Sequence, residues 1–181
     1  MTSATKNLEN DHEYIPRLID VMECITETSA PKVEDLESVV DLIKNFADGL
    51  HHAKEENMLF PLMAEKGFSP NQGPVAVMLH EHNQGRAYVK GIADNIPLYK
   101  EKQQSALVKI IENMQGYINL LRNHIDKENN ILFRMADNVL TVREQQSLLE
   151  RFEEEENNSF PGHKPEDFKK RIEILAKAYL L

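Results

Sequence analysis

Two stretches of the chain repeat one pattern of histidine, glutamate and apolar residues. HHAKEENMLF begins at His51, and HIDKENNILF begins at His124. In both stretches a glutamate follows the first histidine by four residues, and a Leu-Phe pair stands eight and nine residues after it. Imidazole and carboxylate groups bind transition-metal ions. The repeat therefore indicates a metal site built from two segments of the chain.

Helical spacing indicates which of these side chains face the interior. Residues four apart in an α-helix lie on one face. Glu128 lies four residues after His124 and four residues before the apolar Leu132. We therefore expect His124 and Glu128 on the buried face of their helix.

The first stretch offers two such pairs, because its histidines and its glutamates are both consecutive. His51 and Glu55 form one pair, while His52 and Glu56 form a second pair rotated by about 100°. Spacing alone allows either pair to face inward. Alignment of the two Leu-Phe pairs selects His51 and Glu55, and it leaves the second pair at the edge of the site.

Two further segments each supply one candidate histidine. His12 and His82 each follow an apolar residue by four positions. His80 lies two residues from His82, on roughly the opposite side of a helix, so we select His82. His163 stands in a loop-like sequence, FPGHKPED, and we expect it to take no part.

The cost of burying two carboxylates argues for bound cations. Each buried glutamate would carry a desolvation penalty of several kcal/mol unless it is compensated. We see no lysine or arginine at the same inward positions, and neutral imidazoles cannot balance two negative charges. Two divalent ions that share the carboxylates would do so. The candidate metal ligands are His12, His51, Glu55, His82, His124 and Glu128.

The donor set favours iron as the metal. Imidazoles and carboxylates with coordination positions left over are typical of non-haem iron. Structural zinc prefers a closed tetrahedral set, usually with thiolates. Manganese also suits oxygen and nitrogen donors. We expect two iron ions, with manganese and zinc as the alternatives.

Helical periodicity dominates the segments that must position these residues. Four helices are predicted, joined by short connections, so the expected fold is all-α, an up-down-up-down four-helix bundle. Two shorter amphipathic helices follow it. The predicted helices cover approximately residues 8–28, 33–65, 74–96, 101–136, 141–156 and 165–180. We expect residues 1–138 to form the metal-binding domain and residues 139–181 to form a C-terminal extension that packs on the bundle.

Pro16 complicates the first of these helices. If the helix starts near Glu9, the proline lies beyond the first turn and could kink the helix by freeing the carbonyl of His12. Alternatively, the helix starts later and His12 lies at its edge.

Composition restricts the classes of function and partner. A net charge of −9 with scattered basic residues disfavours nucleic-acid binding. No apolar run is long enough for a membrane span, and the N-terminus lacks a signal core. The single cysteine is consistent with a cytoplasmic location. We expect a small diatomic or peroxide ligand, no nucleic acid and no membrane, and we keep a homodimer as an assembly to test.

These motifs resemble the hemerythrin-like proteins, which carry the HHE cation-binding domain. The resemblance spans roughly residues 8–136. It rests on the strings DHE from Asp11, HHAKEENMLFP from His51, EHNQGR from Glu81 and HIDKENNILF from His124. It implies a four-helix bundle with a non-haem di-iron centre. By the resemblance, the four selected histidines are terminal ligands, and the two glutamates bridge the ions.

One departure from the family pattern bears on function. Oxygen-carrying hemerythrins have a fifth histidine one helical turn from the third-helix ligand, and here those positions hold Met78 and Arg86. An open position, a water or Tyr88 could take its place. The set is more similar to bacterial proteins linked to repair of iron centres under stress. We therefore expect a di-iron protein that reacts with or senses O2, NO or peroxide. The alternatives are a non-enzymatic sensing or storage module that acts through a protein partner, and a purely structural bundle.

Overall fold

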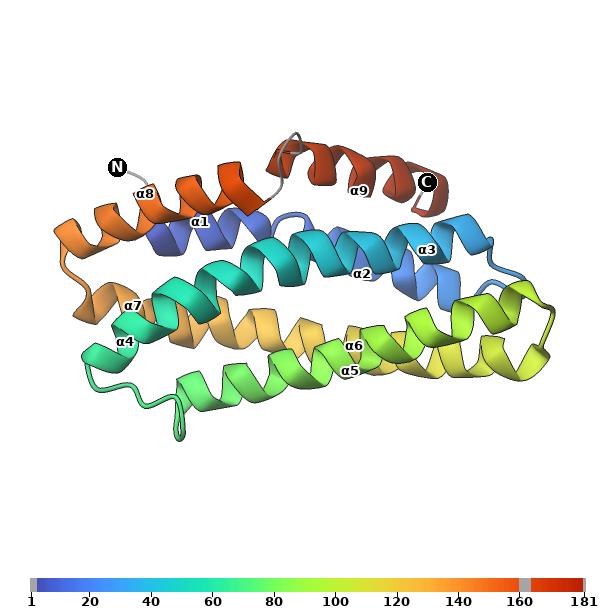
Figure 1. Ribbon diagram of the computed structural model, residues 1–181, viewed down its shortest axis with the longest axis horizontal. Coiled ribbons are helices and arrows are strands. Elements are labelled where there is room, and N and C mark those ends of the chain that lie inside the picture. Colours follow the sequence, from blue (N-terminus) through green and yellow to red (C-terminus); the bar gives the residue numbers. More distant parts are fainter. Residues whose placement is uncertain (1–2, 160–163, 181) are drawn as a thin grey trace.

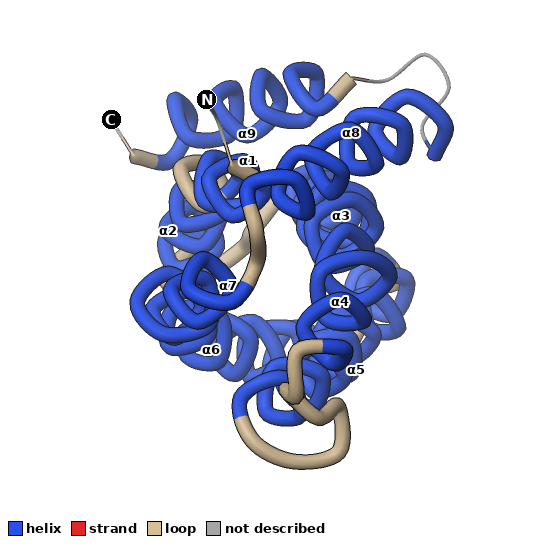
Figure 2. Tube along the Cα trace, turned by 90° about the vertical axis from the view of Figure 1, so that its left-hand side faces the viewer, coloured by secondary structure: helices blue, strands red, loops and turns tan. Residues whose placement is uncertain are grey.

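The computed structural model describes residues 3–159 and 164–180, and every regular element in these ranges is a helix. Four long helical segments run side by side as a bundle, and two shorter helices lie along one side of it (Figures 1 and 2). The expected all-α architecture with additional C-terminal helices is confirmed. His163 lies outside the described residues.

The first segment is interrupted at the position of a candidate ligand. It consists of α1 (Ala4–Asp11) and α2 (Ile15–Thr26), where the sequence predicts one helix from residue 8. Pro16 lies in the first turn of α2, where a missing backbone N–H costs no helical hydrogen bond. The proline therefore begins a second helix instead of kinking the first, and His12 falls in the break.

The second segment is a continuous helix that changes its winding near the predicted site. It consists of α3 (Val33–Leu42), the π-helical η1 (Ile43–His52) and η2 (Glu55–Leu59), and α4 (Phe60–Glu65). The hydrogen bonds of a π-helix span five residues and widen the turn, and such segments are frequent at functional sites. Here they contain the first His–Glu pair.

The third and fourth segments form a long antiparallel pair. The third is α5 (Pro74–Lys100), which follows a glycine with φ of 78° and begins with proline at its first position. The fourth consists of α6 (Gln104–Lys127), η3 (Glu128–Leu132) and α7 (Phe133–Val139). The second glutamate of the repeat therefore also lies at the start of a π-helical segment.

Two C-terminal helices cover the side of the bundle formed by the first two segments. α8 (Val142–Ser159) packs against α1, and α9 (Pro165–Tyr179) packs against α2 (Figure 2). Phe152 of α8 and Phe168 of α9 insert into the core and are buried. Both helices fall close to the predicted ranges.

The apolar core consists of two clusters with a polar layer between them. Each segment passes from one cluster to the other where its candidate ligand lies: Leu50 belongs to the first cluster and Met58 to the second, on either side of the first His–Glu pair. The same change occurs between Leu121 and Leu132. The polar groups are thus enclosed on both sides by hydrocarbon.

Among the described residues, no helix combines the length and hydropathy that crossing a bilayer requires.

The packing of α8 leads to a stability prediction. Phe152 is fully buried, so Phe152→Ala should lower the free energy of unfolding by about 3–5 kcal/mol, as for other phenylalanines removed from a core. Glu153→Ala, at the exposed neighbouring position, is the matched control. Urea unfolding of both variants measures the difference. Equal stabilities of the two variants would show that α8 does not pack as described.

Candidate metal centre

The structure brings the six residues selected from the sequence into one buried layer. Their exposed fractions range from 0% to 7%, and each helical segment of the bundle contributes at least one of them. The residues are His12 after α1, His51 in η1, Glu55 in η2, His82 in α5, His124 in α6 and Glu128 in η3. His80 is exposed, in agreement with the selection of His82.

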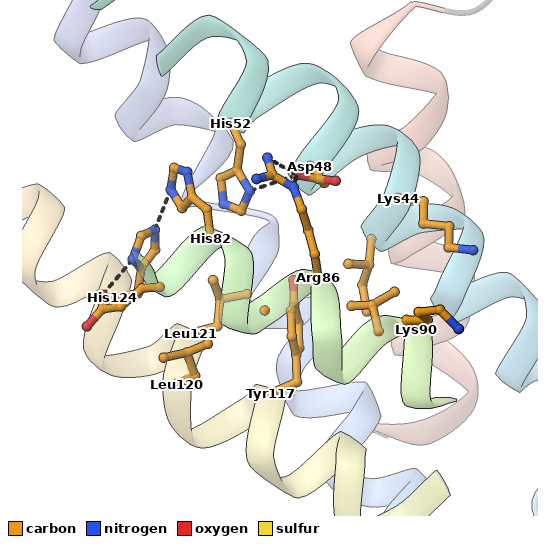
Figure 3. A pocket seen from close by; sticks show the side chains of 14 residues that line it. Lys44, Asp48, His52, His82, Arg86, Lys90, Tyr117, Leu120, Leu121 and His124 are labelled. Atoms are coloured by element: carbon orange, nitrogen blue, oxygen red, sulfur yellow. Dashed lines mark hydrogen bonds and ion pairs between the residues drawn. The ribbon is translucent and has the colours of Figure 1, made fainter. Parts of the chain in front are cut away.

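The four imidazoles form two pairs that meet through their Nε2 atoms. The Nε2 atoms of His12 and His51 are 3.0 Å apart. Those of His82 and His124 are 3.1 Å apart, and Figure 3 shows this second pair. Two nitrogen ligands, each about 2.1 Å from one ion and at right angles, would be about 3 Å apart. The spacing within each pair therefore fits two ligands of one metal ion.

The two glutamates lie between these imidazole pairs. A carboxylate oxygen of Glu128 is 3.3 Å from Nε2 of His12, and its other oxygen is 3.0 Å from Nε2 of His124. Glu55 approaches His51 at 3.8 Å and His82 at 3.5 Å through one oxygen. Each carboxylate thus contacts both pairs, as a group shared by two ions would.

The Nδ1 atom of every candidate histidine is directed at an oxygen outside the layer. His12 meets Asn129 at 2.7 Å, and His51 meets Asp11 at 3.5 Å. The other two contacts are His82 with Glu56 at 2.6 Å and His124 with Glu81 at 2.9 Å. An Nδ1–H that donates to such an oxygen fixes the ring and leaves Nε2 free to bind metal.

These contacts determine where the lone pairs point. The pKa values of Glu56 and Glu81 lie below the ordinary value, because hydrogen bonds from the histidines and from neighbouring cations outweigh partial burial. Both carboxylates are therefore ionised and accept hydrogen bonds from Nδ1–H of His82 and His124. In neutral rings the two Nε2 lone pairs then face each other, an arrangement that is stable only with a cation or an extra proton between them.

The carboxylates at the centre have no compensating donors. All four oxygens of Glu55 and Glu128 are buried without a hydrogen-bond partner among the described residues. Burial raises the pKa of Glu55 well above its ordinary value, and the charge of Glu128 raises it further. For Glu128, burial acts in the same direction, but the surrounding imidazoles, His124 first among them, outweigh it and hold the pKa well below the ordinary value.

Protons are the alternative to metal in this layer. Burial would lower the pKa of His124, but Glu128 and Glu81 outweigh it and raise the pKa to about 9. Without metal, the layer can therefore take up protons at Glu55 and His124, whose pKa values are both raised. Divalent cations would displace such protons and compensate the four unpartnered carboxylate oxygens, so the donor set fits a pair of metal ions.

A buried lysine lies beside the layer, contrary to the expectation that no inward cation is present. Lys54 is fully buried, and its Nζ lies 3.2 Å from Asp11, 3.0 Å from the Asn7 side chain and 2.5 Å from Glu156 of α8. It compensates these groups and has no ion pair with the central glutamates among the described residues. The line from Glu156 through Lys54 and Asp11 to His51 joins the C-terminal extension to the candidate centre.

His52 lies deeper than the edge position inferred from the sequence. It is 6% exposed, and one of its ring nitrogens lies within 4.8 Å of the donor atoms of Glu55, His82 and His124. Its Nδ1 is 3.3 Å from Asp48. The wider turn of η1 directs two consecutive histidines inward, which the spacing of an ordinary α-helix does not predict.

Three further residues around the layer are not predicted from the sequence, namely Asp48, Tyr117 and Asn129. Of these, Tyr117 lies two helical turns before His124 on the same face. Arg86, at one of the two positions where oxygen carriers would have their fifth histidine, pairs with Asp48 and Glu56 through its guanidinium group. These residues come to lie around the layer through contacts between different segments, and the periodicity of a single helix does not predict such contacts.

The chain is similar to known proteins over most of its length. The model of the hemerythrin HHE cation-binding domain matches residues 3–136. An uncharacterized protein of Mycobacterium bovis is 21% identical over 165 residues, covering 87% of this chain and 63% of the relative. The iron-sulfur cluster repair protein YtfE of Edwardsiella ictaluri is 27% identical over 140 residues, covering 73% and 62%. YtfE of Musicola paradisiaca is 30% identical over 133 residues, covering 71% and 60%.

The chain spans about three fifths of the length of these relatives. No solved structure matches it. The family match includes residues from all four segments of the bundle and all six residues of the buried layer, and it ends within α7. The chain therefore belongs to the hemerythrin family of HHE cation-binding domains.

Proposed function

We propose that the buried layer holds two iron ions and that the protein reacts with or senses O2, NO or peroxide. The observation that carries this proposal is the set of four unpartnered carboxylate oxygens between two pairs of facing imidazole nitrogens. Each imidazole pair would bind one ion, and Glu55 and Glu128 would be shared between the two ions. Nitrogen and oxygen donors with positions left open favour iron over zinc.

The residues around the layer orient its imidazoles for metal binding and surround it with apolar side chains. Iron, when bound, supplies the redox chemistry and the position at which a small molecule binds. The oxygen atoms of Asp11, Asn129, Glu56 and Glu81 hold the Nδ1 protons, so the four Nε2 lone pairs point inward. The apolar clusters on both sides exclude water, and among their members the ring of Phe133 stacks on His12.

The relatives bear on the biological role that we propose for this protein. Two of them are named iron-sulfur cluster repair proteins. A four-histidine, two-glutamate layer without the additional histidine of oxygen carriers supports a role in the response to nitrosative or oxidative stress. We infer such a role here in preference to oxygen storage.

A sensing module that acts through a partner is the second candidate. It is favoured by the contacts from Glu156 through Lys54 and Asp11 to His51, because they connect α8 to a candidate ligand. A change in the bound metal would be transmitted to α8 through these contacts.

Glu55→Gln tests the metal layer directly. The variant should lose most of its bound iron, because a neutral amide cannot be shared by two ions. In the metal-free state its free energy of unfolding should equal or exceed that of the wild type, since a buried ionisable group has been removed. Metal analysis and urea unfolding, with the exposed Glu154→Gln as control, measure both effects. Full iron content in Glu55→Gln would contradict the assignment.

Reactivity is tested with the reduced, iron-loaded protein. Addition of O2, NO or hydrogen peroxide should change the optical spectrum, because each molecule can bind an iron with an open position. The Glu55→Gln variant should show no such change. A wild-type spectrum that none of the three molecules alters would rule out this function.

The sensing candidate makes a separate prediction for α8. Iron should slow amide hydrogen exchange in residues 142–159, because an ordered His51 holds Asp11, Lys54 and Glu156 in place. Glu156→Gln should reduce this difference while leaving the iron content unchanged. Identical exchange with and without iron would count against signalling through α8.

A further inference from the structure

A cavity of about 130 Å³ lies directly beside the candidate centre, between η1, α5 and α6 (Figure 3). Its inner end is formed by His52, His82 and His124. The opposite pair, His12 and His51, does not line it. The two halves of the layer therefore differ, and only the half with His82 and His124 borders this space.

Most of the cavity wall is hydrocarbon. Ile43, Val89, Leu120 and Leu121 supply apolar side chains, and Gly85 of α5 leaves additional room by having none. A comparable apolar cavity of about 150 Å³ accommodates benzene. The space is therefore larger than a diatomic molecule needs, and its wall suits an apolar group.

One buried hydroxyl in this wall has no partner. The Tyr117 side chain is 3% exposed, and its OH makes no hydrogen bond to any described residue. Figure 3 shows this hydroxyl pointing from α6 into the space near Arg86. Burial raises the pKa of Tyr117, so the group stays protonated and can donate. An unsatisfied buried hydroxyl is costly, and a ligand with an oxygen acceptor would satisfy it.

His52 offers a second polar group at the inner end. Its ring stacks on the ring of His82 with centroids 3.8 Å apart and planes inclined by 15°. Nearly parallel stacked rings hold their in-plane lone pairs in two separate, nearly parallel planes, so nitrogens of the two rings are poorly placed to bind one ion. With Nδ1 at Asp48, the Nε2 of His52 is left for a molecule bound beside the metal.

The charges near the cavity favour a neutral ligand. Arg86 pairs with Asp48 at 2.7 Å and with Glu56 at 2.7 Å, and Lys90 pairs with Asp94. Lys44 also lines the cavity, but it is exposed to solvent, which screens its charge. The positive charges near the cavity are thus offset or screened and do not select for an anion.

We propose that this cavity binds a small organic hydroperoxide, with its alkyl group against the leucine and valine side chains and its peroxide oxygens between Tyr117, His52 and the His82–His124 end of the layer. The proposal rests on the proposed function, because it specifies the peroxide that reaches the metal. It assigns Tyr117 the role of a hydrogen-bond donor to the ligand.

The first test measures binding without chemistry. Metal-free protein is titrated with tert-butanol, the unreactive analogue of tert-butyl hydroperoxide, and the methyl signals of Leu120, Leu121 and Val89 are followed by NMR. Gly85→Ala should weaken binding by roughly tenfold, since its methyl group would fill the space at ordinary contact distances of 3.5 Å from Tyr117 and 3.8 Å from Leu120. No shift in the wild type, or equal affinity in the variant, would overturn the proposal.

Tyr117→Phe separates a binding role from a structural one. It should weaken tert-butanol binding roughly three- to tenfold, the effect of one hydrogen bond, without lowering the free energy of unfolding. The matched control is Tyr99→Phe, which removes a hydroxyl that donates to the carbonyl of Pro31 at 3.0 Å, away from the cavity. The control should lose stability and keep its affinity. The reverse pattern would make Tyr117 a structural residue.

The second test uses the reduced, iron-loaded protein and stopped-flow spectroscopy. Gly85→Ala should slow the reaction with tert-butyl hydroperoxide by about tenfold and slow the reaction with the smaller hydrogen peroxide much less. If hydrogen peroxide and NO react but the organic hydroperoxide does not, the proposed function stands and the inference is wrong. If no oxidant reacts although tert-butanol binds, the proposed function fails and the hydroperoxide assignment fails with it.

Discussion

Two carboxylates placed in hydrocarbon without donors are the constraint on which the structure depends. Glu55 and Glu128 lie fully buried between imidazoles whose Nε2 lone pairs also point inward. A layer of this kind is stable only if positive charge occupies its centre, either as protons or as metal ions. The oxygens at the Nδ1 atoms direct the Nε2 lone pairs inward, and the two apolar clusters offer no positive charge. The positive charge must therefore come from bound protons or metal ions.

The helices that carry this layer depart from regular α-geometry where the donors lie. The first segment is broken at His12, and π-helical segments contain His51, Glu55 and Glu128. A wider turn changes which residues face inward, and His52, the last residue of η1, lies buried beside the layer. The cavity between η1, α5 and α6 borders only the His82–His124 half of the layer, whereas His12 borders a separate open hollow.

The C-terminal helices are tied to the layer by charge as well as by packing. Lys54, buried at the junction, links Glu156 of α8 with Asp11, the partner of His51. Removing one member of such a buried set leaves an uncompensated charge, which makes the set sensitive to its surroundings. The region outside the family match thus contributes to the position of a candidate ligand.

The sequence by itself determined the helical architecture, the four segments and the six residues of the layer, because periodicity and the repeated His–Glu spacing are local properties of a helix. It left open the effect of Pro16, it placed His52 at the edge of the site, and it missed Lys54, Tyr117 and the oxygens at the Nδ1 atoms. Those features were decided by the tertiary structure alone. They depend on π-helical winding and on contacts between segments, such as that of His82 with Glu56 and that of Lys54 with Glu156, which no spacing within one segment records.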